Sequence, residues 1–193
     1  MITIRPATTA DAAAIATVRA DSWRAAYEGL IPAAALAEAT GPASVRAYTE
    51  SLITRSCAGI LVAEPPPQTQ PGPAGPWECQ VIGFASFGPE RDAAGQLVPP
   101  PEASPSGSAA GELYAIYVHP AYWGGQAGRQ LMTGIVSRAV AQRYASLSLW
   151  VLEANGRARR FYERAGFAVT GESQVLGDLG GVTEIRYWRP LAG

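Results

Sequence analysis

The clearest pattern in the chain is an apolar run, followed by a glycine-rich turn and by apolar positions at helical spacing. Leu113 to Val118 form an aromatic and β-branched run that is typical of a buried strand. His119-Pro120 ends this run, because proline has no N–H to give to a strand ladder. After a turn at residues 123–128, the apolar positions are Leu131, Met132, Ile135, Val136, Ala139 and Val140. The pattern predicts a strand, a turn and a helix.

Such a junction has a chemical consequence. The first turn of a helix has N–H groups without partners inside the helix, and its dipole is positive at that end. Both features favour a phosphate or pyrophosphate. The same residue types are equally compatible with a tight turn that binds nothing.

Shorter patterns predict the rest of one sheet and its helices. A helix begins at Thr8 or Thr9, and the positions Trp23, Tyr27 and Leu30 continue its spacing. Glycine inside a strand often marks a bulge, which is how we interpret Gly83. Strands are predicted at residues 2–5, 60–63, 80–87, 145–152, 167–170 and 182–188, with further helices at 42–54 and after Asn155. Strands with interspersed helices predict an α/β or α+β fold around one mixed sheet.

Two proline-rich segments, near residues 64–78 and 88–110, interrupt the strands. The strands on either side are too few to build separate sheets. We therefore interpret both segments as hairpin insertions, and residues 1–193 as a single domain.

Composition excludes several classes of function. The formal net charge is −1, which does not favour a nucleic-acid or membrane-surface protein. No apolar run approaches the roughly 20 residues of a membrane span. All 15 basic residues are arginines, so no lysine is present for Schiff-base chemistry. Cys57 and Cys79 match no metal spacing, and two cysteines without a signal-like N-terminus predict a reducing cytoplasm.

Two stretches, residues 111–132 and residues 149–167, resemble the GNAT superfamily, the acyl-CoA-dependent N-acetyltransferases. The first is the strand and turn at 111–132, where the family has Arg/Gln-x-x-Gly-x-Gly/Ala. This chain departs from that motif at Trp123 and Gln126 and keeps Gly128. The second, residues 149–167, is similar to the family's later strand, Asn-led helix with a tyrosine, and closing Gly-Phe. Residues 4–7 and 22–27 are also similar, so the resemblance spans nearly the whole chain apart from the two insertions.

The resemblance implies a mixed, mostly antiparallel sheet flanked by helices and an enzyme that uses acetyl-CoA. The acetyl group would pass to a primary amine by direct attack in a ternary complex. The acceptor would be a small-molecule amine or a protein N-terminus, and a homodimer is common in the family. A catalytically silent acyl-CoA sensor or interaction module is the alternative, supported by Trp123 and Gln126. A nucleotide-binding βαβ domain is disfavoured, because neither the acidic residue after a Gly-x-Gly-x-x-Gly nor a P-loop lysine is present.

The resemblance also assigns cofactor-binding residues. Main-chain groups of Ile116, Tyr117 and Val118 would pair with the pantetheine arm. Asn155 would contact that arm, and it is also a plain helix N-cap candidate. The candidates for holding the phosphates are Gly124, Gly125, Gln126, Ala127, Gly128 and Arg129.

The chemical candidates each have a structural alternative. Tyr162 would lie near the thioester sulfur as general acid, or else it is a core aromatic residue. Glu112 would act as base through a water, or else it is a solvated charge at a strand end. The only histidine, His119, has a suitable intrinsic pKa, but its place before Pro120 indicates a structural role. Trp23 and Tyr27 would form a wall of the acceptor cleft by resemblance, or else they pack in the core.

Overall fold

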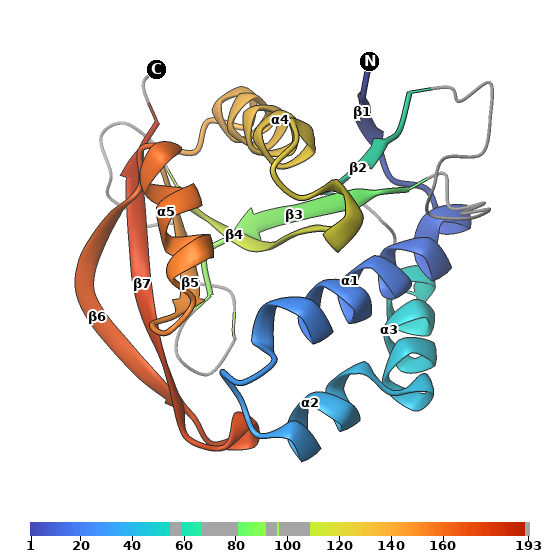
Figure 1. The fold of residues 1–193 in the computed structure, drawn as a ribbon. Coiled ribbons are helices and arrows are strands. Elements are labelled where there is room, and N and C mark those ends of the chain that lie inside the picture. The colour runs from blue at the N-terminus through green and yellow to red at the C-terminus, as the bar shows by residue number, and fades with distance from the viewer. Residues whose placement is uncertain (55–58, 67–80, 92–95, 97–108, 192–193) are drawn as a thin grey trace.

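A computed structural model describes residues 1–54, 59–66, 81–91, 96 and 109–191 (Figure 1). Within these residues, seven strands form one sheet in the order β1-β2-β3-β4-β5-β7-β6. Neighbouring strands are antiparallel except β4 and β5, which are parallel. The predicted fold class is therefore confirmed. The strands are β1 (Thr3–Pro6), β2 (Ile60–Glu64), β3 (Gly83–Pro89), β4 (Ala110–Val118), β5 (Ser146–Leu152), β6 (Ala168–Leu176) and β7 (Val182–Pro190).

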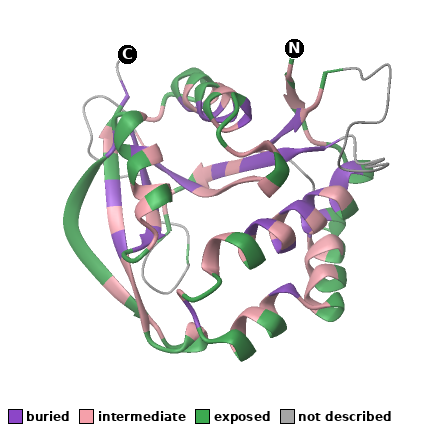
Figure 2. Cartoon of the chain, viewed as in Figure 1, coloured by how far each residue is buried: buried purple, intermediate pink, exposed green. Residues whose placement is uncertain are grey.

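Helices cover both faces of this sheet (Figure 1). The α-helices are α1 (Ala12–Tyr27), α2 (Ala33–Thr40), α3 (Pro42–Thr54), α4 (Ala127–Ala141) and α5 (Gly156–Arg164). Strand β2 shows how the layers are built, because its alternate residues point to opposite faces. Ile60 and Val62 pack with α1 and α3, whereas Leu61 and Ala63 pack with α4. Buried positions accordingly run through the middle of the sheet (Figure 2).

Most of the predicted elements are confirmed, although several bounds differ, such as the start of β4 at Ala110 instead of Leu113. Three of the differences are explained by the structure. Helix α1 ends at Tyr27, because the chain leaves the helical conformation at Glu28, where ψ is 123°, and turns at Gly29, which has a positive φ of 74°. Helix α2 was not predicted, since its alanine-rich sequence has little apolar periodicity. Strand β6 is longer than the predicted strand at 167–170. The prediction was too short because most β6 residues are exposed at the sheet edge, and their sequence shows no alternation of apolar and polar positions.

The predicted bulge at Gly83 is wrong. The register between β3 and β4 shifts between Ser86 and Phe87, which pair with Ala115 and Leu113, so Tyr114 on β4 is the extra residue. Gly83 is needed for a different reason: a Cβ there would lie 2.9 Å from the carbonyl oxygen of Tyr117.

The strands that flank each proline-rich segment pair as antiparallel neighbours, β2 with β3 and β3 with β4, as expected for hairpin insertions. Residues 67–80, 92–95 and 97–108 lie outside the described residues, as do Cys57 and Cys79. The single-domain assignment stays a prediction. Among the described helices, none has the length and apolar character needed to cross a bilayer.

A buried carboxylate fastens the start of α1 to the sheet edge. Asp11, 7% exposed, accepts two hydrogen bonds from the guanidinium of Arg5 on β1, both at 2.8 Å. It also accepts from the N–H and hydroxyl of Thr8 at 2.7 and 3.0 Å. The bond from Arg5 is the main reason why the pKa of Asp11 falls from 3.8 to about 2.

We predict that Asp11→Asn lowers the free energy of unfolding by about 2 kcal/mol at pH 7. Because the pKa of Asp11 is depressed in the folded state, this contribution is complete above its ordinary pKa of 3.8 and is lost as the pH falls through about 2. Urea unfolding at several pH values measures it. Glu172→Gln, which removes an exposed ion pair, is the control and should cost less than about 1 kcal/mol. Parallel pH curves for Asp11→Asn and the parent would contradict the prediction.

Candidate active site

The sheet opens between its two parallel strands. β4 and β5 pair only from Ala110 with Ser146 to Glu112 with Ser148. Beyond Glu112, β4 carries its bulge at Tyr114, and no described strand pairs with it on the β5 side. A bulge bends and twists its strand, which accounts for the divergence. The opening exposes one edge of β4 to a ligand.

A cleft of about 1010 Å³ occupies this opening. It brings together most of the residues predicted from the sequence. These are Trp23, Tyr27, Glu112, Ile116, Tyr117, Val118, Gly124, Gly125, Gly128, Arg129, Asn155 and Tyr162. The side chains of two other candidates do not line it, because Ala127 is buried and Gln126 points to solvent. His119 also lies outside the lining: its Nδ1 accepts from the Ala121 N–H at 3.3 Å and its Nε2 lies 3.6 Å from Asp21.

The glycine turn is unstrained at Gln126. Positive φ is found at Gly124 (79°), whereas Gln126 has φ −92° and forms the N-cap position of α4. The departure from the family motif at Gln126 therefore carries no backbone penalty, and replacing it with glycine would relieve none. The Gln126 side chain does not cap the helix, so N–H groups of its first turn stay available.

Trp123, the other departure from the motif, joins the turn to its neighbours. Its indole N–H donates to the Val118 carbonyl oxygen at 2.6 Å, and the Arg157 guanidinium lies 3.8 Å from its ring centroid. The Ser22 hydroxyl donates to the same Val118 oxygen at 2.9 Å. The end of β4 is thus held by α1 and by the turn, and the turn is held by α5.

Two of the three predicted β4 residues face the opening with their main-chain groups. The N–H of His119 donates to the Ile82 carbonyl, on the β3 side of β4. Because alternate residues of a strand direct these groups to opposite edges, those of Ile116 and Val118 face the opening. Tyr117 directs its main chain towards β3, and its side chain lines the cleft.

Helix α5 supplies Asn155 and Tyr162. Asn155 accepts from the Ala158 N–H at 3.1 Å, which confirms that it is the N-cap. Tyr162 is 9% exposed, and its ring centroid lies 6.1 Å from that of Phe167, so it packs in the core as well as lining the cleft. Burial is the main reason why the pKa of Tyr162 is raised far above its ordinary value. Its hydroxyl therefore keeps its proton at neutral pH and can donate it.

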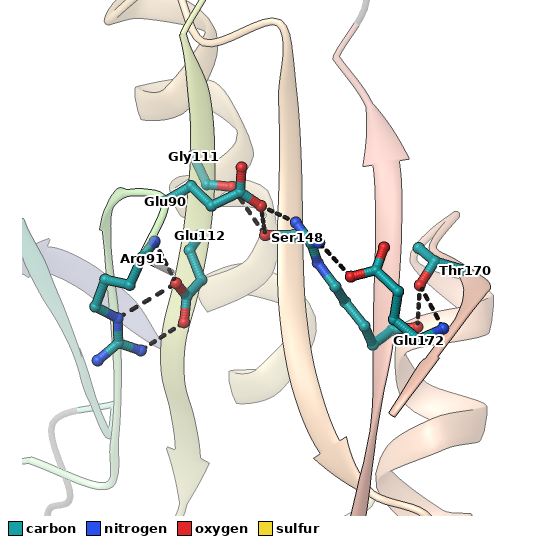
Figure 3. Close-up of polar contacts among 8 residues, drawn as sticks. Glu90, Arg91, Gly111, Glu112, Ser148, Thr170 and Glu172 are labelled. Atoms are coloured by element: carbon teal, nitrogen blue, oxygen red, sulfur yellow. Dashed lines mark hydrogen bonds and ion pairs between the residues drawn. The ribbon is translucent and has the colours of Figure 1, made fainter. Parts of the chain in front are cut away.

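Glu112 is buried and ion-paired rather than solvated (Figure 3). It is 3% exposed, and Arg91 contacts both of its oxygens, Nη2 at 2.5 Å from Oε1 and Nε at 3.3 Å from Oε2. The main-chain N–H of Arg91 donates to Oε2 at 3.0 Å. Both carboxylate oxygens of Glu112 are therefore occupied by donors from Arg91.

The polar network continues across the sheet from Glu90 (Figure 3). Glu90 accepts from the Ser148 hydroxyl on β5 at 2.9 Å and from the guanidinium of Arg186 on β7. Arg186 also donates to Glu172 on β6 at 2.6 Å. This network and the Arg91–Glu112 pair tie the strands together at the point where β4 and β5 stop pairing.

Sequence reasoning missed several residues that line the cleft, among them Trp150, Gln174 and Glu184. The only sequence feature that bears on Glu184 is the alternation of side chains along β7, which places Glu184 on the same face as Arg186. Alternation does not show which face borders a cleft. Among the described residues, no group of three His, Cys, Asp or Glu side chains is placed to hold a metal ion.

A mixed sheet that splays between two central strands, with an uncapped helix N-terminus beside the opening, defines a protein built to hold an extended, anionic ligand. Residues 44–167 match a family model described as "Acetyltransferase (GNAT) family". The chain belongs to this family, and it is an acyltransferase with acetyl-CoA as its donor.

Known proteins are similar over most of the chain. It is 32% identical over 155 residues to the uncharacterized N-acetyltransferase YuaI of Bacillus subtilis, a match that spans 80% of this chain and 74% of YuaI. The PaiA N-acetyltransferase of Thermoplasma acidophilum, solved with coenzyme A, has a TM-score of 0.66 at 18% identity, covering 96% of this chain and 98% of that one. YncA of Salmonella typhimurium, solved with acetyl-CoA, has a TM-score of 0.64 at 22% identity, covering 99% and 94%. The two structures show the shared fold.

We predict that Gly124→Ala lowers the free energy of unfolding by about 1 kcal/mol, the usual cost of a side chain at positive φ. A Cβ at Gly124 would have no atom within 4 Å, so the cost comes from the backbone alone. Gln126→Ala, where φ is negative, is the matched control and should change stability by less than about 0.5 kcal/mol. Urea unfolding measures the free energy of unfolding of both variants. Equal losses would mean that the positive φ at Gly124 is not the cause of the destabilisation.

Proposed function

We propose that this protein is an N-acetyltransferase that passes an acetyl group from acetyl-CoA to a primary amine by direct attack within a ternary complex. The observation that carries the proposal is the opening between β4 and β5, which a buried tyrosine hydroxyl and an uncapped helix N-terminus border together. Family membership fixes the class of reaction, and these residues supply the parts that the reaction needs.

The residues present suit the donor. Main-chain groups of Ile116 and the N–H of Val118 would pair with the pantetheine amides along the free edge of β4. The Val118 carbonyl oxygen is already used, since it accepts from Trp123 and Ser22. The phosphates would meet the first-turn N–H groups of α4, with Arg129 beside them. Asn155 would contact the arm through its amide N–H₂, since its side-chain oxygen is used as the cap of α5.

Bound acetyl-CoA supplies a thioester, which an amine attacks readily once it is neutral and aligned. The chain's own residues position the amine and manage the protons. Tyr162 would donate its proton to the departing sulfur as negative charge develops there. A phenol carries its proton at neutral pH even at its ordinary pKa of about 10, so the Tyr162 hydroxyl has a proton to donate.

The acceptor is a small-molecule amine or a protein N-terminus in this proposal. Solved structures that share the fold include a ribosomal-protein-alanine N-acetyltransferase of Brucella melitensis at 22% identity and a TM-score of 0.64. The fold is therefore compatible with a protein acceptor. A cytoplasmic location and a homodimer belong to the proposal as expectations from the sequence and the family.

The alternative, a catalytically silent acyl-CoA sensor, rested on Trp123 and Gln126. The unstrained backbone of Gln126 and the structural contacts of Trp123 remove that support. We therefore retain the enzyme as the function that the site favours.

We predict micromolar binding of acetyl-CoA, about −8 kcal/mol, measured by titration calorimetry. Gly128→Asp should weaken it at least about tenfold, because a carboxylate in the first turn of α4 repels phosphate. Gly128→Asn, of equal size and without charge, is the control and should lose much less. The fold should tolerate both variants, since a Cβ here would meet Phe161 at 3.4 Å. Equal losses for the two would mean that the phosphates bind elsewhere.

We predict that Tyr162→Phe lowers kcat by about 100-fold, within the range of general acid catalysis. The ring and its packing are kept, so stability and acetyl-CoA affinity should survive. The loss should appear in kcat rather than KM, because the donated proton matters most in the transition state. Thiol release at one pH measures kcat, and calorimetry measures affinity. An unchanged kcat would return Tyr162 to a purely structural role.

A further inference from the structure

The described lining of the cleft contains two acidic side chains, Glu112 and Glu184, in different electrostatic situations. Glu112 is neutralised by Arg91, which contacts both of its oxygens. Glu184 on β7 accepts from the Gln174 amide on β6 at 3.2 Å, through Oε2. No donor among the described residues reaches Glu184 Oε1, and no described cation is paired with it. It is the carboxylate of the cleft that is left for a ligand.

Basic side chains gather at the other part of the cleft. Arg129 lies in the first turn of α4, and Arg157 stacks on Trp123 of the glycine turn. These charges suit the phosphates of the donor. A cleft with cations beside the turn and an unpaired anion on β7 suits two ligands of opposite charge.

Three tyrosines line the cleft together with Glu184. Tyr27 comes from α1, Tyr117 from β4 and Tyr162 from α5, and Tyr117 acts electrostatically on both Tyr27 and Tyr162. The negative charge of Glu184 acts on both Tyr27 and Tyr162. Trp23 packs edge-on against Tyr27, with ring centroids 5.0 Å apart. Aromatic rings and a carboxylate are the groups that bind ammonium ions.

The pKa of Glu184 is raised above its ordinary value, which favours a role in accepting a proton. Burial is the main cause that raises its pKa, the Gln174 hydrogen bond lowers it, and repulsion from Glu112 raises it further. The titratable groups facing it are Glu112, Tyr27 and Tyr162 from other elements. Arg186, two residues along β7, is held by Glu90 and Glu172.

We propose that Glu184 binds the acceptor as an ammonium ion, in a pocket formed with Tyr27, Tyr117 and Tyr162, and then takes its proton. This inference rests on the proposed acetyl transfer. The ammonium gives one proton to Glu184, and the neutral amine attacks the acetyl carbon, so that a C–N bond forms and the C–S bond breaks. Tyr162 gives a proton to the sulfur and recovers the surplus proton of the nitrogen. The products are an amide, a thiol and a protonated Glu184, which releases its proton to solvent.

The pocket also defines the class of acceptor. A carboxylate next to the amino group would be repelled by Glu184 and would find Arg91 already paired. The expected acceptor is therefore a primary amine without an α-carboxylate. Free α-amino acids should be poor substrates.

Thiol release with acetyl-CoA and 2-phenylethylamine as the probe, measured across pH, tests the pocket. Glu184→Gln should lower kcat/KM by about 100-fold and remove the acid limb of its pH profile. Glu184→Asp should restore part of the rate, and acetyl-CoA affinity should stay within about twofold by calorimetry. Glu172→Gln, an acid on the same sheet outside the cleft lining, is the control and should match the parent. Glu112→Gln, run beside them, should keep the acid limb.

The outcomes separate this inference from the function on which it rests. A parent protein that gives no heat with acetyl-CoA overturns the proposed function itself. If acetyl-CoA binds but 2-phenylethylamine is not acetylated, or if phenylalanine reacts equally well, the pocket is overturned and cofactor binding stands. If Glu184→Gln keeps both the rate and the acid limb, Glu184 is not the base. Loss of the limb in Glu112→Gln alone would assign the base to Glu112.

Discussion

The structure depends on a single interruption of hydrogen bonding, the point at which β4 and β5 stop pairing after Glu112. Main-chain N–H and C=O groups cannot be left buried without partners, so a split in the middle of a sheet needs either water or a ligand. The chain satisfies part of this demand itself, because Ser22 and Trp123 both donate to the Val118 carbonyl. The remaining edge of β4 is the surface on which an extended amide-rich molecule can pair.

The point at which β4 and β5 separate must be held in a fixed position, and the buried polar network holds it. Glu112 is the last β4 residue that pairs with β5, and Arg91 closes over it while Glu90 reaches Ser148 on β5. Buried ion pairs gain little net stability, because desolvation offsets most of the attraction. Their directional bonds nevertheless fix positions. We interpret the Arg91–Glu112 pair as a device that holds the opening at one width, which leaves the chemistry of amine deprotonation to an unpaired carboxylate.

Local patterns predicted what local forces determine. The strand, turn and helix around residue 124 followed from apolar spacing and glycine content, and the Asn155 cap followed from the preference of its side chain for helix starts. The sequence could not reveal the bulge at Tyr114, because a bulge depends on the partner strand, nor the positive φ at Gly124 rather than at Gln126. Glu184 was missed for a similar reason, since alternation in β7 does not say which face borders the cleft. Arg91 lies 21 residues before its partner Glu112, beyond the reach of any local rule.

The all-arginine character of the chain has one more consequence. Arginine guanidinium groups bind the carboxylates of Asp11 and Glu112, and the Arg157 guanidinium stacks on Trp123. Each of these contacts uses a planar group that lysine lacks. A guanidinium stays protonated at any physiological pH and does not act as a nucleophile. With no ε-amino group in the sequence, no side-chain amine can compete with the acceptor for the acetyl group. An acetyltransferase of this composition has no lysine side chains of its own to acetylate, however long acetyl-CoA remains in its cleft.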